Sequence, residues 1–108
     1  MKPVSKLSFD IPKDTDILLC HCPPFGYGDA ISAKDRLGSE ALTEAIKNTP
    51  KLKAVFFGHA HENHGWVGKI NNTLLANVSV VDERNELVNV LPVFEIDSNG
   101  QCHLLEYV

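Results

Sequence analysis

Two short apolar segments, each ending at histidine, constrain this chain more than any other feature. Residues 16–21 end at His21, and residues 53–57 lead directly into a Gly-His-Ala-His tetrapeptide at 58–61. Almost continuously apolar runs of this length, bounded by proline or glycine, are typical of buried strands. If the two strand ends lie side by side, the imidazoles of both segments converge at one rim.

The tetrapeptide has the pattern of a metal-ligand pair. On an extended segment, residues two apart project to the same side, so His59 and His61 present their imidazoles together while Ala60 turns away. Gly58 removes a Cβ where the chain leaves the strand. The alternative is a turn that merely contains polar histidines. The pairing with His21 favours the metal-ligand interpretation, in which all three histidines are ligands.

A helix is predicted between the two strands, with Ser39 as its cap and an end near Asn48, before Thr49-Pro50. Strand, helix and strand imply a right-handed βαβ unit with parallel strands. Both histidine groups then lie at the carboxyl ends of the strands, where α/β sheets usually bind ligands. After Gly65 the pattern changes to antiparallel strands. We expect these strands at residues 66–70, 73–80, 91–96 and 102–107, with turns at 71–72 and 97–100.

Length and charge restrict the class of protein further. The 108 residues suffice for one domain, with residues 1–10 as a loosely ordered leader and residues 11–108 as the domain. A net charge of −4 argues against nucleic acid as an obligate partner. No apolar run suits a signal peptide or a membrane span. With three cysteines and no export signal, a reducing, cytoplasmic location is expected.

Three separate motifs now point to a family. Residues 16–24, 58–62 and 73–79 resemble, in order, the C-terminal half of a calcineurin-like metallophosphoesterase. The resemblance covers about residues 11–97 and is closest to the metallophosphoesterase-domain-containing subgroup of class III cyclic-nucleotide-phosphodiesterase-like proteins. It implies an α/β fold: part of a β-sandwich flanked by helices, in which one βαβ unit is followed by antiparallel strands.

The resemblance also implies a binuclear metal centre that hydrolyses phosphate mono- or diesters. His21 and His59 would match ligands of the second metal, and His61 a ligand of the first. Two divalent ions, manganese, iron or zinc, would polarise the phosphoryl oxygens and generate hydroxide near neutral pH.

The family's earlier motifs mark the main departure. An Asp-x-His, a Gly-Asp whose aspartate bridges the metals and a Gly-Asn-His-Asp with the general-acid histidine have no counterpart here, and the stretch before Asp14 is too short for them. Three neutral ligands would leave two dications without compensating charge. Catalysis by this chain therefore needs a second segment, and no residue is assigned as catalytic.

Several other residues have weaker functional interpretations. His64 is a loop residue that a family-like pocket would bring to substrate phosphate, and Asn77 supports either the metal rim or the sheet. Cys20 and Cys22 are read as small buried hydrophobes rather than thiolate ligands. Trp66 is assigned to the core, although it could stack on a base, and His103 to a structural role.

Three functions remain open on sequence alone. The first is an incomplete metal-dependent phosphoesterase whose substrate binds once the missing N-terminal half is supplied. The second is a truncated, non-catalytic module whose exposed apolar face drives self-association or binding to another protein. The third, ranked last, is a mononuclear zinc site of the three histidines with an open water position.

Overall fold

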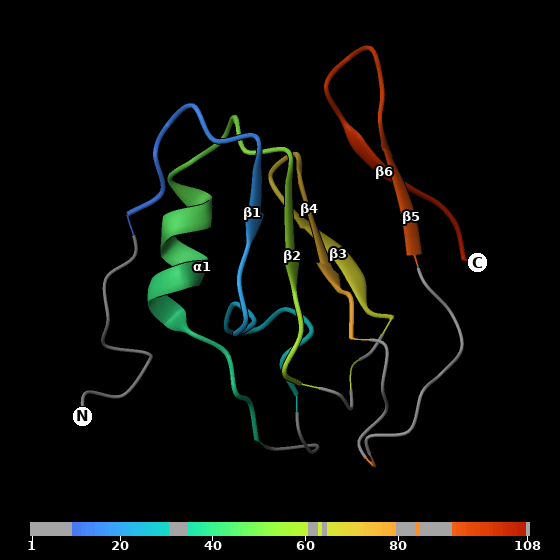
Figure 1. Cartoon of the computed structure of the whole chain (residues 1–108). Coiled ribbons are helices and arrows are strands. Elements are labelled where there is room, and N and C mark those ends of the chain that lie inside the picture. Colours follow the sequence, from blue (N-terminus) through green and yellow to red (C-terminus); the bar gives the residue numbers. More distant parts are fainter. Residues whose placement is uncertain are drawn as a thin grey trace.

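Strand β1 (Ile17–Leu19), helix α1 (Glu40–Lys47) and strand β2 (Ala54–Phe57) form the first unit of the fold (Figure 1). The computed structural model describes residues 10–30, 35–60, 63, 65–79, 84 and 92–107. The predicted leader at residues 1–10 lies, except for Asp10, outside this part of the chain. Strands β1 and β2 are parallel neighbours, with Leu19 opposite Phe56. The parallel pairing expected across the helix is therefore confirmed.

The main sheet has four strands in the order β1-β2-β4-β3. Strands β3 (Val67–Ile70) and β4 (Thr73–Asn77) form the hairpin predicted around Asn71, which has a φ of 54°. Strand β4 also pairs in parallel with β2, with Phe57 opposite Asn77. The expectation of purely antiparallel strands after Gly65 is wrong at this point, because the hairpin returns β4 into the buried position beside β2. The fold class, α/β, is confirmed as a mixed sheet with one short helix.

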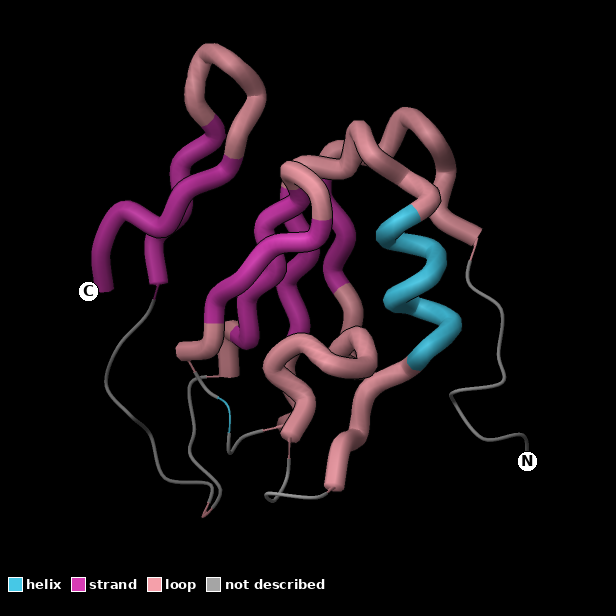
Figure 2. The backbone as a smooth tube through the Cα atoms, turned by 180° about the vertical axis from the view of Figure 1, so that it is seen from behind, coloured by secondary structure: helices cyan, strands magenta, loops and turns pink. Residues whose placement is uncertain are grey.

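Helix α1 covers one face of the sheet (Figures 1 and 2). Its predicted cap is confirmed, because the Ser39 hydroxyl accepts a hydrogen bond from the Leu42 amide at 3.1 Å. An acidic residue in its first turn and a basic residue in its last turn suit the helix dipole. Its buried side chains join the main core, whose fully buried members are Leu42, Ile46, Leu52, Val55, Phe57, Ile70 and Leu75.

The opposite face of the sheet is covered in part by a second hairpin. Strands β5 (Pro92–Ile96) and β6 (Cys102–Tyr107) pair antiparallel, as predicted for a terminal hairpin. The Phe94 ring lies 4.8 Å from the Phe56 ring, between centroids, and Cys102 is buried in a small cluster with Ala54, Leu74 and Ala76. Two layers of strands therefore enclose this second cluster. That the layers belong to a metallophosphoesterase sandwich stays a prediction.

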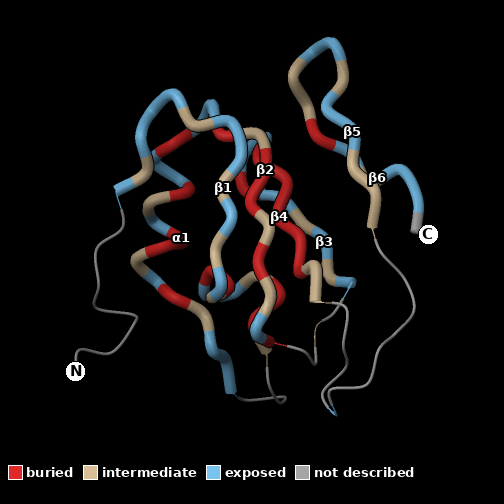
Figure 3. The backbone as a smooth tube through the Cα atoms, viewed as in Figure 1, coloured by how far each residue is buried: buried red, intermediate tan, exposed pale blue. Residues whose placement is uncertain are grey.

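Strand β1 is not the buried strand that its apolar sequence predicts. Ile17 is 43% exposed and Leu19 is 73% exposed, whereas every residue of β4 is buried (Figure 3). The physical reason is position, because β1 is an edge strand and only the face that carries Leu18 packs on the main core. An apolar sequence indicates that a whole strand is buried only when both faces of its sheet are covered.

The turn of the β5–β6 hairpin is organised by one carboxylate. One Asp97 oxygen accepts hydrogen bonds from the Asn99 and Gln101 amides, and the other lies 2.7 Å from His103 Nε2. The Gln101 amide, followed by the His103 side chain, holds the pKa of Asp97 below its usual value of 3.8. His103 thus has the structural role expected from the sequence.

Substitution of His103 tests this turn. We expect Asp97 to titrate below 3.8 in the folded chain and His103→Gln to raise its pKa only part of the way, because the Gln101 amide remains. Since the folded pKa is depressed, this contribution to stability is present above the unfolded pKa and is lost as pH falls through the folded pKa. Carboxyl-carbon NMR titration measures the pKa, with His21→Gln as control. An Asp97 pKa at or above 3.8 contradicts the assignment.

Candidate functional site

The structure brings His21 and His59 together at the carboxyl ends of β1 and β2. His21 Nε2 lies 2.9 Å from His59 Nδ1, and the ring centroids are 4.5 Å apart. Both residues are exposed, and the Gly58 amide donates to the His21 carbonyl at 3.3 Å, which continues the pairing of the two strands to the rim. Two imidazoles that are 38 positions apart in sequence therefore share one edge of the sheet.

The backbone around His59 differs from the extended segment that the sequence suggests. Strand β2 ends at Phe57, and the Ala60 amide donates to the Gly58 carbonyl at 2.7 Å, which closes a three-residue turn centred on His59. His59 has a φ of 65°, a left-handed conformation that costs a non-glycine residue about 1–3 kcal/mol. The expectation that His59 lies on an extended segment, where residues two apart project to the same side, is thus wrong. The turn, not a strand, aims the His59 ring.

Asn77 holds this turn in place from the end of β4. Its side chain is buried, and its amide nitrogen donates to the Ala60 carbonyl at 2.9 Å and to the Gly28 carbonyl at 3.2 Å. Its amide oxygen accepts from the Ser79 backbone at 3.1 Å. One side chain therefore ties the His59 turn to the loop that follows His21. Hydrogen bonds to buried carbonyls are costly to lose, so Asn77 is suited to offset the strain at His59.

The loop after His21 is built around the buried carboxylate of Asp29, which pairs with the exposed Arg36. Asp29 is fully buried, with Oδ1 2.6 Å from Arg36 Nη1, while Oδ2 accepts from the Gly26 and Gly38 amides at 3.1 Å each. Asp29 follows a glycine but is not a counterpart of the family's bridging aspartate, and both of its carboxylate oxygens have these partners. Asp29 shapes the loop rather than bridging metals. No sequence signal distinguished it beforehand, because an Asp in a glycine-rich loop is ordinary turn chemistry.

The separation of the two ring nitrogens suits a shared metal ion. Two imidazole nitrogens, each about 2.1 Å from one divalent ion, lie about 3 Å apart at the roughly 90° angle of an octahedral site and about 3.4 Å apart at the tetrahedral angle of zinc. The observed 2.9 Å is a hydrogen-bond distance between the two rings and is close to the octahedral spacing. Among the described residues, however, no group of three or more His, Cys, Asp or Glu side chains could hold a metal ion. His61 and His64 lie outside the described residues, so their metal-binding and substrate-binding roles stay predictions.

The remaining chemical candidates near the rim are structural. Burial, followed by the charge of Cys22, raises the pKa of the Cys20 thiol from 9.0 to about 11, so Cys20 stays neutral near pH 7. Trp66 packs partly buried against the main core, with its ring 6.2 Å from Tyr27 and 6.5 Å from Phe57. Neither residue offers a reactive group or a free stacking face to the histidine pair.

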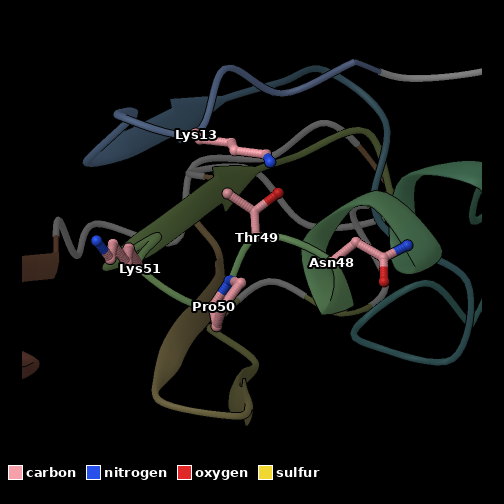
Figure 4. Close-up of a pocket in the computed structure, with 5 residues that line it drawn as sticks. All are labelled: Lys13, Asn48, Thr49, Pro50 and Lys51. Carbon is pink, nitrogen blue, oxygen red and sulfur yellow. The ribbon is translucent and has the colours of Figure 1, made fainter.

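In the described part of the chain, two cavities lie at opposite ends of the parallel strands. One, about 410 Å³, includes His21 and Gly58 in its lining and so opens at the histidine rim. The other, about 280 Å³, lies where α1 ends and is lined by Lys13, Asn48, Thr49, Pro50 and Lys51 (Figure 4). None of the described residues that line this second cavity is a histidine, a cysteine or a carboxylate. Because ligands of α/β sheets bind at the carboxyl ends of strands, the rim is the candidate site.

Comparison with known proteins gives matches, over part of their length, to proteins that are named for a metallophosphoesterase domain. Metallophosphoesterase domain-containing protein 1 of Homo sapiens is 32% identical over 80 residues, which make up 73% of this chain and 24% of that protein. A UPF0046 protein of Caenorhabditis elegans is 33% identical over 86 residues, 80% of this chain and 22% of its own length. The chain is homologous to these proteins over the matched segment, which confirms the resemblance found in the motifs.

The chain spans about a quarter of the length of these relatives. No protein-family model and no solved structure matches it. In the described part of the chain, no helix is long and apolar enough to cross a membrane.

Substitution of Asn77 tests its role in positioning the site. Asn77→Ala removes all three hydrogen bonds, so we expect it to lower the free energy of unfolding by about 2–4 kcal/mol and to separate the two histidine rings. Chemical denaturation measures the stability, and NOEs between the rings report their proximity.

Thr73→Val is the matched control. Thr73 is buried at the other end of β4, and its hydroxyl donates to the Leu52 carbonyl at 2.6 Å. We expect this variant to be less stable while the ring-to-ring NOEs remain. Intact NOEs in folded Asn77→Ala would show that the turn keeps its shape without this side chain.

Proposed function

We propose that this chain supplies one half of the metal rim of a metallophosphoesterase, and that the completed domain hydrolyses phosphate mono- or diesters with divalent metal ions. The observation that carries the proposal is the 2.9 Å approach of His21 Nε2 to His59 Nδ1 at the carboxyl edge of the sheet. The homology to metallophosphoesterase domain-containing protein 1 supports the reaction class.

The histidines and Asn77 would have different roles at this rim. His21 and His59 would hold one divalent ion through the two nitrogens that face each other, and His61 would reach a neighbouring ion. Asn77 keeps the His59 turn in its strained form, so the ring is aimed before metal arrives. A bound divalent metal supplies Lewis acidity toward a phosphoryl oxygen and lowers the pKa of a bound water. Zinc, manganese and iron all accept imidazole nitrogen.

We expect the carboxylates of a complete centre to come from another segment. In the described part of the chain, Asp29 is buried and pairs with Arg36, and Asp16, which pairs with Lys53, precedes β1 at the end of the strand opposite the rim. Two dications close together need anionic ligands to offset their repulsion. Activity therefore requires a region of the kind that makes up the remaining three-quarters of the relatives.

A second candidate function is association without catalysis. Ile17 and Leu19 are exposed on β1, whose outer edge pairs with no other strand in the described part of the chain. Exposed apolar edge strands commonly pair with another chain. This function is favoured over the first if the chain self-associates through β1 and binds no metal.

Zinc binding tests the rim directly. We expect the chain to bind zinc at one equivalent, with the affinity lowered more than about 100-fold in His21→Ala and in His59→Gly, since each removes a ligand. Glycine is chosen at position 59 because it accepts the φ of 65° without strain. Isothermal titration calorimetry measures the affinity. His103→Ala, which removes an exposed histidine of the hairpin, is expected to bind zinc as the parent does. Equal affinities in all four chains would refute the rim site.

Hydrolysis tests the reaction class. We expect this chain alone to leave bis(4-nitrophenyl) phosphate intact, because the motifs that supply anionic ligands in the family have no counterpart in its sequence. Joined to the region that precedes the matched segment in the human relative, the chain is expected to hydrolyse the diester with manganese and to lose that activity on His59→Gly. Release of 4-nitrophenol gives the rate. A joined chain that is folded and binds manganese yet shows no hydrolysis contradicts the proposal.

A further inference from the structure

The cavity at the histidine rim has walls that the metal site does not use. It is lined by Leu19 at the end of β1, Phe56 and Gly58 at the end of β2, and Val78 just after β4, and His21 closes it toward the rim. Its volume of about 410 Å³ falls within the usual range of small-molecule sites, about 300–1,000 Å³. The cavity and the metal rim thus share one residue, His21.

The described walls of the cavity are uncharged and mostly apolar. Among the described residues that line it none is Asp, Glu, Lys or Arg, and apart from Cys20, His21 and Gly58 they are aliphatic or aromatic. Uncharged walls favour an uncharged group, because a buried charge without a partner is costly. An anionic phosphoryl group would therefore stay at the rim, and the cavity would receive the rest of the molecule.

Two walls of this open cavity, Phe56 and Val78, are supported from behind. The Phe56 ring contacts the Phe94 ring of β5 at 4.8 Å, and Val78 and Phe56 both pack against the buried cluster of Ala54, Leu74 and Cys102. Leu19 is the exception, since its side chain is 73% exposed at the mouth of the cavity. A flat apolar ligand would cover Leu19 and remove this surface from water, which is favourable.

We propose that this cavity is the site for the alcohol portion of the substrate, and that the chain selects phosphoesters of flat, uncharged aromatic alcohols. This proposal rests on the proposed function for the position of the phosphoryl group, but binding of the alcohol itself needs no metal. A polypeptide is the less suitable occupant, because stable protein interfaces bury about 1,200–2,000 Å² and this cavity is the size of one ring system.

The test uses the 108-residue chain and three probes: 1-naphthol, 1-naphthyl phosphate and inorganic phosphate. Amide NMR spectra are recorded with and without zinc. We expect 1-naphthol alone to shift the amides of Leu19, Phe56 and Val78 without zinc. With zinc bound, 1-naphthyl phosphate is expected to bind more tightly than either 1-naphthol or inorganic phosphate, because it occupies the cavity and the rim together.

Two variants separate the cavity from the rest of the surface. Leu19→Asn is expected to weaken the binding of 1-naphthol and 1-naphthyl phosphate about tenfold while zinc affinity stays unchanged. Because Leu19 is mostly exposed, this variant keeps the core intact. Leu105→Asn replaces a leucine that is 57% exposed on β6, away from the cavity, and is expected to change neither affinity.

Each outcome decides one of the two proposals. If the chain binds no zinc but 1-naphthol still shifts the Leu19 amide, the metal rim is overturned and the cavity remains supported. Zinc bound without any shift at Leu19, Phe56 and Val78, or a Leu19→Asn variant that binds 1-naphthol normally, overturns the cavity. If the Leu19 amide signal broadens as the protein concentration rises, and 1-naphthol does not change this, a second chain covers the surface. This outcome also overturns the cavity proposal.

Discussion

The parallel register between β1 and β2 determines where the chemistry of this chain can lie. With Leu19 opposite Phe56, the two strands end level with each other, so the residues just beyond them occupy one edge of the sheet. His21 and His59 are those residues, and their ring nitrogens approach to 2.9 Å. The helix between the strands, capped by Ser39 and anchored by Leu42 and Ile46, fixes this register from one face. The site is thus a consequence of strand pairing rather than of local sequence.

The strained turn at His59 orients its ring relative to His21 at this edge of the sheet. His59 keeps a φ of 65° only because the surrounding backbone is held, and Asn77 supplies that support through the Ala60 and Gly28 carbonyls. Asn77 itself is fixed by the parallel pairing of β4 with β2. Strain of this kind persists at functional sites where neighbouring interactions over-determine it. The buried Asp29 carboxylate, paired with the exposed Arg36, shapes the same loop.

Periodicity and cap chemistry predicted the parts of the fold that depend on local sequence. Helix α1 begins after Ser39 and strand β6 spans residues 102–107, both as expected. The convergence of His21 with His59 followed from the strand–helix–strand order. The predictions that failed concern features that depend on contacts between residues distant in sequence. Leu19 is exposed because β1 is an edge strand on which only the face that carries Leu18 packs against the main core. Strand β4 pairs in parallel with β2 because the β3–β4 hairpin places it there. The left-handed turn at His59 depends on Asn77, which follows 18 positions later, and no local pattern encodes it.

The central claim is that His21 and His59 form a single metal-binding pair at the strand ends. The most direct measurement is the nitrogen chemical shift of each imidazole during a zinc titration of the chain. The account predicts that His21 Nε2 and His59 Nδ1 shift together and reach their end points at one equivalent, while the nitrogens of His103 stay unchanged. Shifts of the two rings at different zinc concentrations, or a shift of only one of them, would contradict it.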